Sequence, residues 1–292
     1  MYNRILLKVL KTWLAALSSI VIAGPALAFS TSPALVGASC AGSPNTAKTS
    51  TSTSRAKSTP WMGQSFNAQA VASMGRIARH PALAVPHVSV PHIGHLDFEM
   101  LRKMGCKGVV FDKDNTLTAP YADDAHHLVE EGLRRCMEAF KGRVCIMSNS
   151  AGTRDDLDCA DAIRIEKALG IPVVRHDAKK PGGIEDVLAF FAENDSEVRL
   201  DELCFVGDRL LTDVVFGNLY GMLTVHTQPL TLQGDNRPAA IFRFLERKVF
   251  LDVLQATFSV QPETHRFCPE GAAGLTRPSN YVAVEPLPST IS

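Results

Sequence analysis

The most restrictive feature of the sequence is an alternation of short apolar runs and longer amphipathic stretches between residues 107 and 257. The apolar runs predict strands at 107–112, 143–148, 171–175, 203–207 and 222–226, and the amphipathic stretches predict helices at about 126–140, 155–169, 183–193 and 238–255. Short runs without polar alternation are typical of strands buried on both faces. The chain is therefore predicted to form an α/β domain whose five-stranded parallel sheet is covered by helices on both sides.

Charge separates this domain from the N-terminal part of the chain. No Asp or Glu precedes Asp97, so the first 96 residues carry a net charge of +8, and the remainder carries 30 acidic against 22 basic residues (30 − 8), a net of −8. Such a split is typical of a targeting segment joined to a folded domain. The acidic domain has no basic stripe, which argues against nucleic-acid binding.

The N-terminal segment has the pattern of a cleavable leader. Basic residues precede an apolar run from Trp13 to Ala23, and small residues follow it, so residues 1–28 resemble a signal peptide. A membrane anchor is the alternative, but the run is short and is followed by Gly24-Pro25. Residues 29–60 are rich in Ser and Thr and contain no acid, as transit peptides do. We expect residues 1–75 to be a targeting presequence, removed or disordered, resembling the two-part presequences of plastids acquired by secondary endosymbiosis, with a mitochondrial presequence as the competing interpretation.

These features divide the chain into three parts. The folded domain is expected at residues 76–258, and residues 259–292, which are rich in proline, are expected to form a disordered tail. The seven cysteines include no Cys-x-x-Cys pair and are irregularly spaced. This pattern argues against a disulfide framework and against a zinc site, and it favours a reducing compartment.

Polar side chains follow four of the predicted strands. They are Asp112 and Asp114 after the first strand, Ser148 and Asn149 after the second, Lys179 and Lys180 after the third, and Asp208, Arg209 and Asp213 after the fourth. Each group alone has an ordinary explanation, since an Asp-x-Asp after a strand is more often a surface turn than a site. The carboxyl ends of parallel strands meet at one edge of a sheet, so the four groups in this order predict a single site.

Phosphate-ester hydrolysis explains the paired carboxylates. One carboxylate can attack phosphorus and become an acyl phosphate, and the other can protonate the leaving alkoxide and then activate water. A divalent metal would offset the repulsion between carboxylate and phosphate. Asp208 can bind that metal, while Asp213 can bind it or brace the following helical turn. Arg209 can clamp a second phosphate of the substrate, or form a salt bridge at the helix start.

The four groups resemble the signature motifs of the haloacid dehalogenase (HAD) superfamily. The resemblance implies a HAD-like Rossmannoid three-layer sandwich, with Asp112 as nucleophile and Asp114 as acid/base. Thr116 also fits, because phosphatases of this superfamily carry Asp-x-Asp-x-Thr/Val.

The same resemblance assigns the remaining roles. Ser148 and Asn149 would contact phosphate, and Lys180, in preference to Lys179, would balance the charge of nucleophile and phosphate. The expected cofactor is Mg²⁺, with Asp112, Asp114 (through its backbone carbonyl), Asp208 and Asp213 as its surroundings.

Longer strings narrow the family. Asp112 to Tyr121, Ser148 to Thr153, Arg175-His176 with Lys179 to Gly182, and Val206 to Asp213 together resemble the organellar phosphatidylglycerophosphate phosphatases, over about residues 86–250. The resemblance implies a lipid substrate, peripheral membrane association, and a place in phosphatidylglycerol and cardiolipin synthesis.

Two other functions remain open at this stage. The sequence leaves no room for a substantial cap domain between the motifs, which favours a substrate presented by something larger, such as a membrane. The first alternative is a phosphatase of a soluble phosphomonoester such as a phosphosugar. The second is a non-catalytic binding module with the same fold, against which the intact Asp112, Asp114, Lys180 and Asp208 argue.

Overall fold

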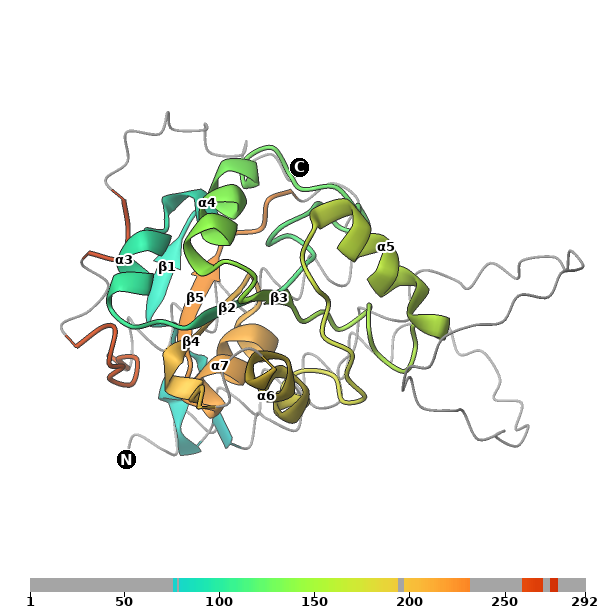
Figure 1. Cartoon of the computed structure of the whole chain (residues 1–292). Helices are drawn as coiled ribbons and strands as arrows, with labels where there is room; N and C mark the ends of the chain where they lie inside the picture. Colours follow the sequence, from blue (N-terminus) through green and yellow to red (C-terminus); the bar gives the residue numbers. More distant parts are fainter. Residues whose placement is uncertain (1–75, 78, 194–196, 232–258, 270–273, 278–292) are drawn as a thin grey trace, which may run out of the picture.

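The computed structural model describes residues 76–77, 79–193, 197–231, 259–269 and 274–277. At its centre lies a five-stranded, wholly parallel sheet with the strand order β1-β5-β4-β2-β3 (Figure 1). The strands are β1 (Val88–Val90), β2 (Gly108–Phe111), β3 (Val144–Ile146), β4 (Leu203–Gly207) and β5 (Leu223–Thr227). The predicted α/β class and the number of strands are confirmed.

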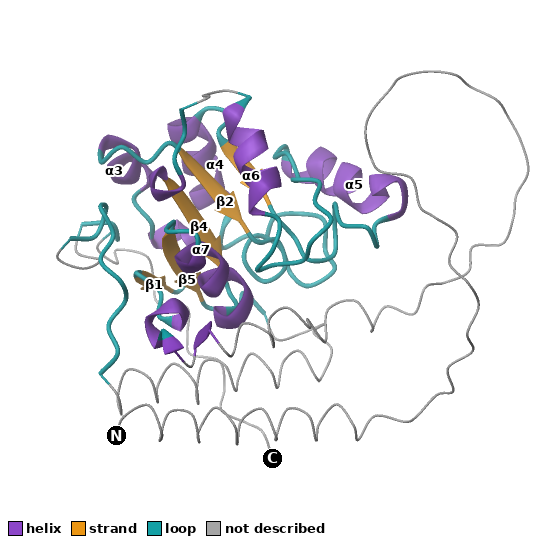
Figure 2. Ribbon diagram, turned by 90° about the horizontal axis from the view of Figure 1, so that it is seen from below, coloured by secondary structure: helices purple, strands orange, loops and turns teal. Residues whose placement is uncertain are grey.

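Helices cover both faces of this sheet. On β2, Val109 and Phe111 point into the core shared with α3 (Phe98–Lys103) and α4 (Glu130–Phe140). Val110 points the other way, into the core shared with α6 (Ile184–Ala192) and, through Phe216, with α7 (Val215–Leu219). This alternation is the period of two that a strand imposes, and here both faces are apolar. The three-layer sandwich is visible in Figure 1, and α5 (Ala160–Leu169) lies beyond β3 at the edge of the domain in Figures 1 and 2.

The sheet differs from the prediction at its two edges. The predicted strand at 171–175 is reduced to a single parallel bridge between Ile146 and Val173. Pro172 has no N–H to donate, and the N–H of His176 donates to the carbonyl oxygen of Gly152, so the chain leaves the ladder after one residue. The fifth strand is instead β1, at the opposite edge, which pairs with β5.

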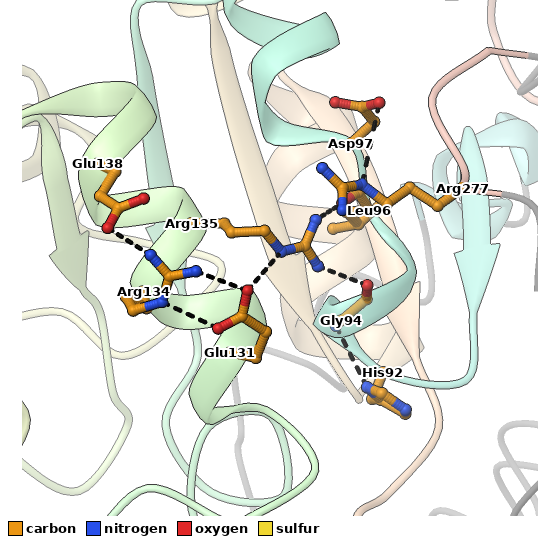
Figure 3. Close-up of polar contacts among 9 residues, drawn as sticks. All are labelled: His92, Gly94, Leu96, Asp97, Glu131, Arg134, Arg135, Glu138 and Arg277. Carbon is orange, nitrogen blue, oxygen red and sulfur yellow. Dashed lines mark hydrogen bonds and ion pairs between the residues drawn. The ribbon is translucent and has the colours of Figure 1, made fainter. Parts of the chain in front are cut away.

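The segment before α3 packs on the domain. Val88, Val90 and Leu96 are buried in the main core. Arg135 of α4 donates to the carbonyl oxygens of Gly94 and Leu96 at 2.7 and 3.2 Å, which fixes the short helical turn at Ile93–His95 against α4 (Figure 3). The close approach of the backbones also requires Gly132, since a Cβ there would lie 2.9 Å from Gly94.

The tail expected to be disordered contributes to the core where it is described. Phe267, Cys268 and Leu275 are buried in the main core cluster. The N–H of Asp97 donates to the carbonyl oxygen of Leu275, and the N–H of Arg277 to that of His95. The proline content of this segment therefore does not prevent packing, because a few apolar side chains and two backbone hydrogen bonds tie it to the residues around α3. The predicted helix at 238–255 and the presequence at 1–75 lie outside the described residues.

No inserted domain occupies the described part of the segment between β3 and β4, which holds only α5, α6 and short turns at Leu157–Cys159 and Leu200–Glu202. The absence of a substantial cap thus agrees with the prediction over those residues. In the same described ranges, none of the helices combines the length and hydropathy needed to cross a membrane. All six cysteines in these ranges are buried, and none of them forms a disulfide there.

Candidate active site

The candidate site lies where the strand order reverses. After β2 the chain moves outward to β3, and it then returns to the other side of β2 to form β4. In α/β sheets the crevice at such a point, beyond the carboxyl ends of the strands, is where ligands bind. Asp112 follows β2 and Asp208 follows β4, and the N–H of Asp112 donates to the carbonyl oxygen of Val206 at 2.8 Å.

Lys180 connects the strand ends at the centre of the site. Its side chain is fully buried, and its Nζ lies 2.6 Å from Oδ1 of Asp112 and 2.6 Å from Oδ1 of Asp213. Two carboxylates from distant parts of the chain thus share one ammonium. The structure therefore brings Lys180, and not Lys179, to the predicted nucleophile; Lys179 instead pairs with Asp155 at 2.7 Å.

These contacts perturb both ends of the ion pair. Burial raises the pKa of the Asp112 carboxyl to about 6, against the attraction of Lys180 and with the added repulsion of Asp213. Burial alone would lower the pKa of the Lys180 ammonium, but the carboxylates of Asp112 and Asp213 outweigh it and raise that pKa. The ammonium is thus held charged beside a carboxyl group whose pKa is raised.

Gly207 lets Asp213 reach this position. Asp213 lies in a π-type turn at Leu210–Val214, and its Oδ2 accepts the N–H of Arg209 at 3.1 Å. A Cβ on Gly207 would lie 2.4 Å from that Oδ2, which is far inside van der Waals contact. The glycine at the end of β4 is therefore required for the carboxylate to pack against the strand and face Lys180.

Three carboxylates form a group that fits a divalent cation. Asp112, Asp208 and Asp213 are buried, and one oxygen of each lies within 4.8 Å of the others. Hard cations such as Mg²⁺ prefer carboxylate oxygen ligands.

The charge balance of the buried site agrees with this donor set. Four buried carboxylates, those of Asp112, Asp114, Asp208 and Asp213, face the two buried ammonium groups of Lys113 and Lys180, so the excess is two negative charges (4 − 2). One divalent cation offsets that excess. Without a cation, burying two uncompensated negative charges would be costly.

Asp114 lies beside Asp112 and has partners of its own. Its Oδ1 accepts a charge-assisted hydrogen bond from Nζ of Lys113 at 2.9 Å and the backbone N–H of Tyr121 at 3.2 Å. Asn115 turns the chain here with a φ of 63°. The three-carboxylate group does not include Asp114, and the metal contact through its backbone carbonyl stays a prediction.

The predicted phosphate-binding residues Ser148 and Asn149 lie at the same edge of the sheet, and each has its own hydrogen-bond partner within the protein. Oγ of Ser148 lies 3.1 Å from Oγ of Ser150. Oδ1 of Asn149 accepts the backbone N–H of Lys180 at 2.8 Å, so this side chain positions the lysine. Nε2 and Nδ1 of His176 lie 2.9 and 2.8 Å from the carbonyl oxygens of Ser148 and Ala178, which ties the two loops together.

Two features of the site were not found by sequence reasoning. Lys113 and Gly207 were not among the predicted site residues, although a lysine between two carboxylates and a glycine before a carboxylate are signals in the sequence itself.

Arg209, predicted to clamp a second phosphate, lies just after β4 with its Nε buried.

Comparisons with known proteins identify the family of the chain. The model of the mitochondrial phosphatidylglycerophosphate (PGP) phosphatase family matches residues 68–231, more than half of the chain. Phosphatidylglycerophosphate phosphatase 1, chloroplastic, from Chlamydomonas reinhardtii is 41% identical over 209 residues, which cover 70% of this chain and 75% of that protein.

Two further relatives come from a plant and a yeast. Phosphatidylglycerophosphate phosphatase 1, chloroplastic/mitochondrial, from Arabidopsis thaliana is 42% identical over 58% of this chain, and the match spans about half (48%) of that protein. Phosphatidylglycerophosphatase GEP4, mitochondrial, from Saccharomyces cerevisiae is 33% identical over 50% of this chain and 78% of that protein.

Proposed function

The chain belongs to the family of mitochondrial PGP phosphatases, and from this membership we propose that it removes the terminal phosphate of phosphatidylglycerophosphate to give phosphatidylglycerol. The observation that carries the chemistry is the fully buried Lys180, which joins Asp112 to Asp213 beside Asp208. A phosphomonoester binding there would meet a carboxylate nucleophile, an ammonium and a cation site at once.

The proposed reaction uses the two carboxylates after β2. An Asp112 oxygen attacks phosphorus, the bond from phosphorus to the glycerol oxygen breaks, and an acyl phosphate forms on Asp112. Asp114 takes up a proton when the substrate binds and gives this proton to the leaving oxygen. Asp114 then takes a proton from water, whose oxygen attacks phosphorus, and inorganic phosphate leaves as the Asp112 carboxylate is restored.

Lys180 and the metal site offset charge during both steps. The Lys180 ammonium stabilises Asp112 before attack and the phosphoryl oxygens during it. Asp112 and Asp208, with Asp213 and the Asp114 carbonyl close by, would hold Mg²⁺, which when bound would reduce the repulsion between the carboxylate and the phosphate dianion. Ser148 would donate to a phosphoryl oxygen.

The proposed setting is the surface of an organelle membrane. Relatives carry the names chloroplastic and mitochondrial, which support a plastid or mitochondrial location. In the described residues no inserted domain lies between β3 and β4, and the proposal is that a phospholipid headgroup enters the site from a bilayer.

The test is Mg²⁺-dependent phosphate release by the full chain from phosphatidylglycerophosphate in mixed micelles, compared with a panel of soluble phosphomonoesters. We expect strong preference for the lipid, and loss of activity in Asp112→Asn, which keeps the shape of the side chain. Preference for a soluble ester would contradict the lipid substrate but agree with the proposed phosphatase chemistry. Inactivity of the folded wild-type protein on every ester would remove both.

A further inference from the structure

A second buried ammonium lies on the acid/base side of the site. Lys113 is only 4% exposed, and its Nζ lies 2.9 Å from Oδ1 of Asp114. Its backbone is fixed, because its carbonyl oxygen accepts the N–H groups of Leu117 at 2.9 Å and Thr118 at 3.1 Å. The nucleophile already has its own cation in Lys180. Lys113 is therefore balanced by Asp114, and its burial stays favourable only while an anion lies beside it.

The proposed reaction indicates on which side of the substrate Lys113 lies. Phosphorus must approach Asp112, and the carboxyl of Asp114 must reach the oxygen that leaves phosphorus. Lys113, which pairs with Asp114, therefore lies on the side of the leaving group. When Asp114 engages the leaving oxygen it gives up at least part of the ion pair, and a buried ammonium that loses its counter-charge is strongly unfavourable.

An anion on the leaving group would replace that counter-charge. We propose that Lys113 binds the phosphodiester on the leaving group of the substrate, and that it thereby selects phosphomonoesters that carry a second, singly charged phosphate. The inference rests on the proposed function, since phosphatidylglycerophosphate has such a phosphodiester across a glycerol from the leaving oxygen. A soluble phosphosugar with one phosphate has no group to take this place.

The test separates the two phosphate positions with two inhibitors of PGP hydrolysis by the full chain. Glycerophosphoglycerol, the deacylated product headgroup, carries the phosphodiester, and inorganic phosphate occupies the position of the monoester. Lys113→Met should weaken inhibition by glycerophosphoglycerol by about tenfold to a hundredfold, the range for one charge-assisted hydrogen bond, and should change inhibition by phosphate much less. Lys179→Met is the matched control, because it removes the same charge from the lysine that pairs with Asp155.

A second variant distinguishes loss of the lysine charge from loss of the fold. Lys113→Arg keeps the positive charge and should retain most of the inhibition by glycerophosphoglycerol. Equal weakening of both inhibitors in Lys113→Met, or loss of turnover in both Lys113 variants with the fold intact, would assign Lys113 to Asp114 alone and overturn the inference. Failure of the wild-type protein to hydrolyse PGP would instead overturn the proposed function, so the two failures are distinguishable.

Discussion

Gly207→Ala tests the geometry of the site through a single methyl group. Gly207 does not have a positive φ, so alanine adds no backbone strain there. Its Cβ would lie 2.4 Å from Oδ2 and 2.5 Å from Cγ of Asp213. Van der Waals contact requires roughly 3.5 Å, so the Asp213 carboxylate must retreat by about 1 Å.

That displacement has a calculable consequence. The Asp213 carboxylate would lose its contact with Nζ of Lys180, now at 2.6 Å, and its hydrogen bond from the N–H of Arg209, now at 3.1 Å. Removing one partner of a buried ion pair costs about 3–5 kcal/mol, and weakening the pair by this displacement should cost up to the lower end of that range. We therefore expect the free energy of unfolding to fall by about 3 kcal/mol and phosphatase activity to fall by about a hundredfold, since Lys180 would no longer be held beside Asp112.

Urea unfolding and phosphate release, both measured at fixed Mg²⁺, check this prediction. The control is a double-mutant cycle with Asp213→Gly, which removes the three atoms nearest the added methyl group. In that background Gly207→Ala should cost less than about 1 kcal/mol, the usual range for a substitution without a clash. An equal cost in both backgrounds, or a fully active and stable Gly207→Ala protein, would refute the argument that Gly207 exists to admit Asp213.

Three further predictions concern charge. Lys180→Met should reduce phosphate release by more than about a hundredfold, whereas Lys179→Met should leave it nearly unchanged; similar losses in the two variants would contradict the assignment of Lys180. Mg²⁺ should raise the midpoint of thermal unfolding in the wild-type protein, and Asp208→Asn should remove most of that increase; an equal increase in both would place the cation elsewhere. Burial, with a contribution from His265, lowers the pKa of His87 from 6.5 to about 4. The unfolded chain therefore binds more protons than the folded protein between these pH values, so the free energy of unfolding should fall by up to about 3 kcal/mol as the pH drops from 6.5 to 4. Urea unfolding at both pH values measures this fall. The same fall in His87→Gln would exclude this histidine as the cause.

The sequence predicts the central strands well because their signal is local. The apolar runs at 107–112 and 203–207 are long enough to be buried on both faces, and they become β2 and β4. The edges of the sheet are decided by less local factors. Pro172 limits the segment after β3 to one bridge, while Val88–Val90 is too short a run to be distinguished from a loop until it pairs with β5.

The same distinction holds in the candidate site. The residue types and their order predict which groups meet, since parallel strands end at a common edge. Contacts between particular atoms depend on loop paths that no pattern encodes. Lys180 reaches Asp112 because Asn149 holds its backbone N–H, and the Asn149 side chain predicted to contact phosphate is engaged in doing so. Arg209 and the helix at 238–255 keep only their sequence-based interpretations.

The arrangement of charge explains why positioning residues surround the reacting ones. Asp112 and Asp114 are two residues apart, yet each pairs with a different lysine, Lys180 at 2.6 Å and Lys113 at 2.9 Å. In the proposed reaction, these separate ion pairs would hold one carboxyl for phosphorus and the other for the leaving group before any substrate arrives. The remaining excess of negative charge is what a divalent cation offsets, so cation binding should stabilise the fold as well as assist the reaction.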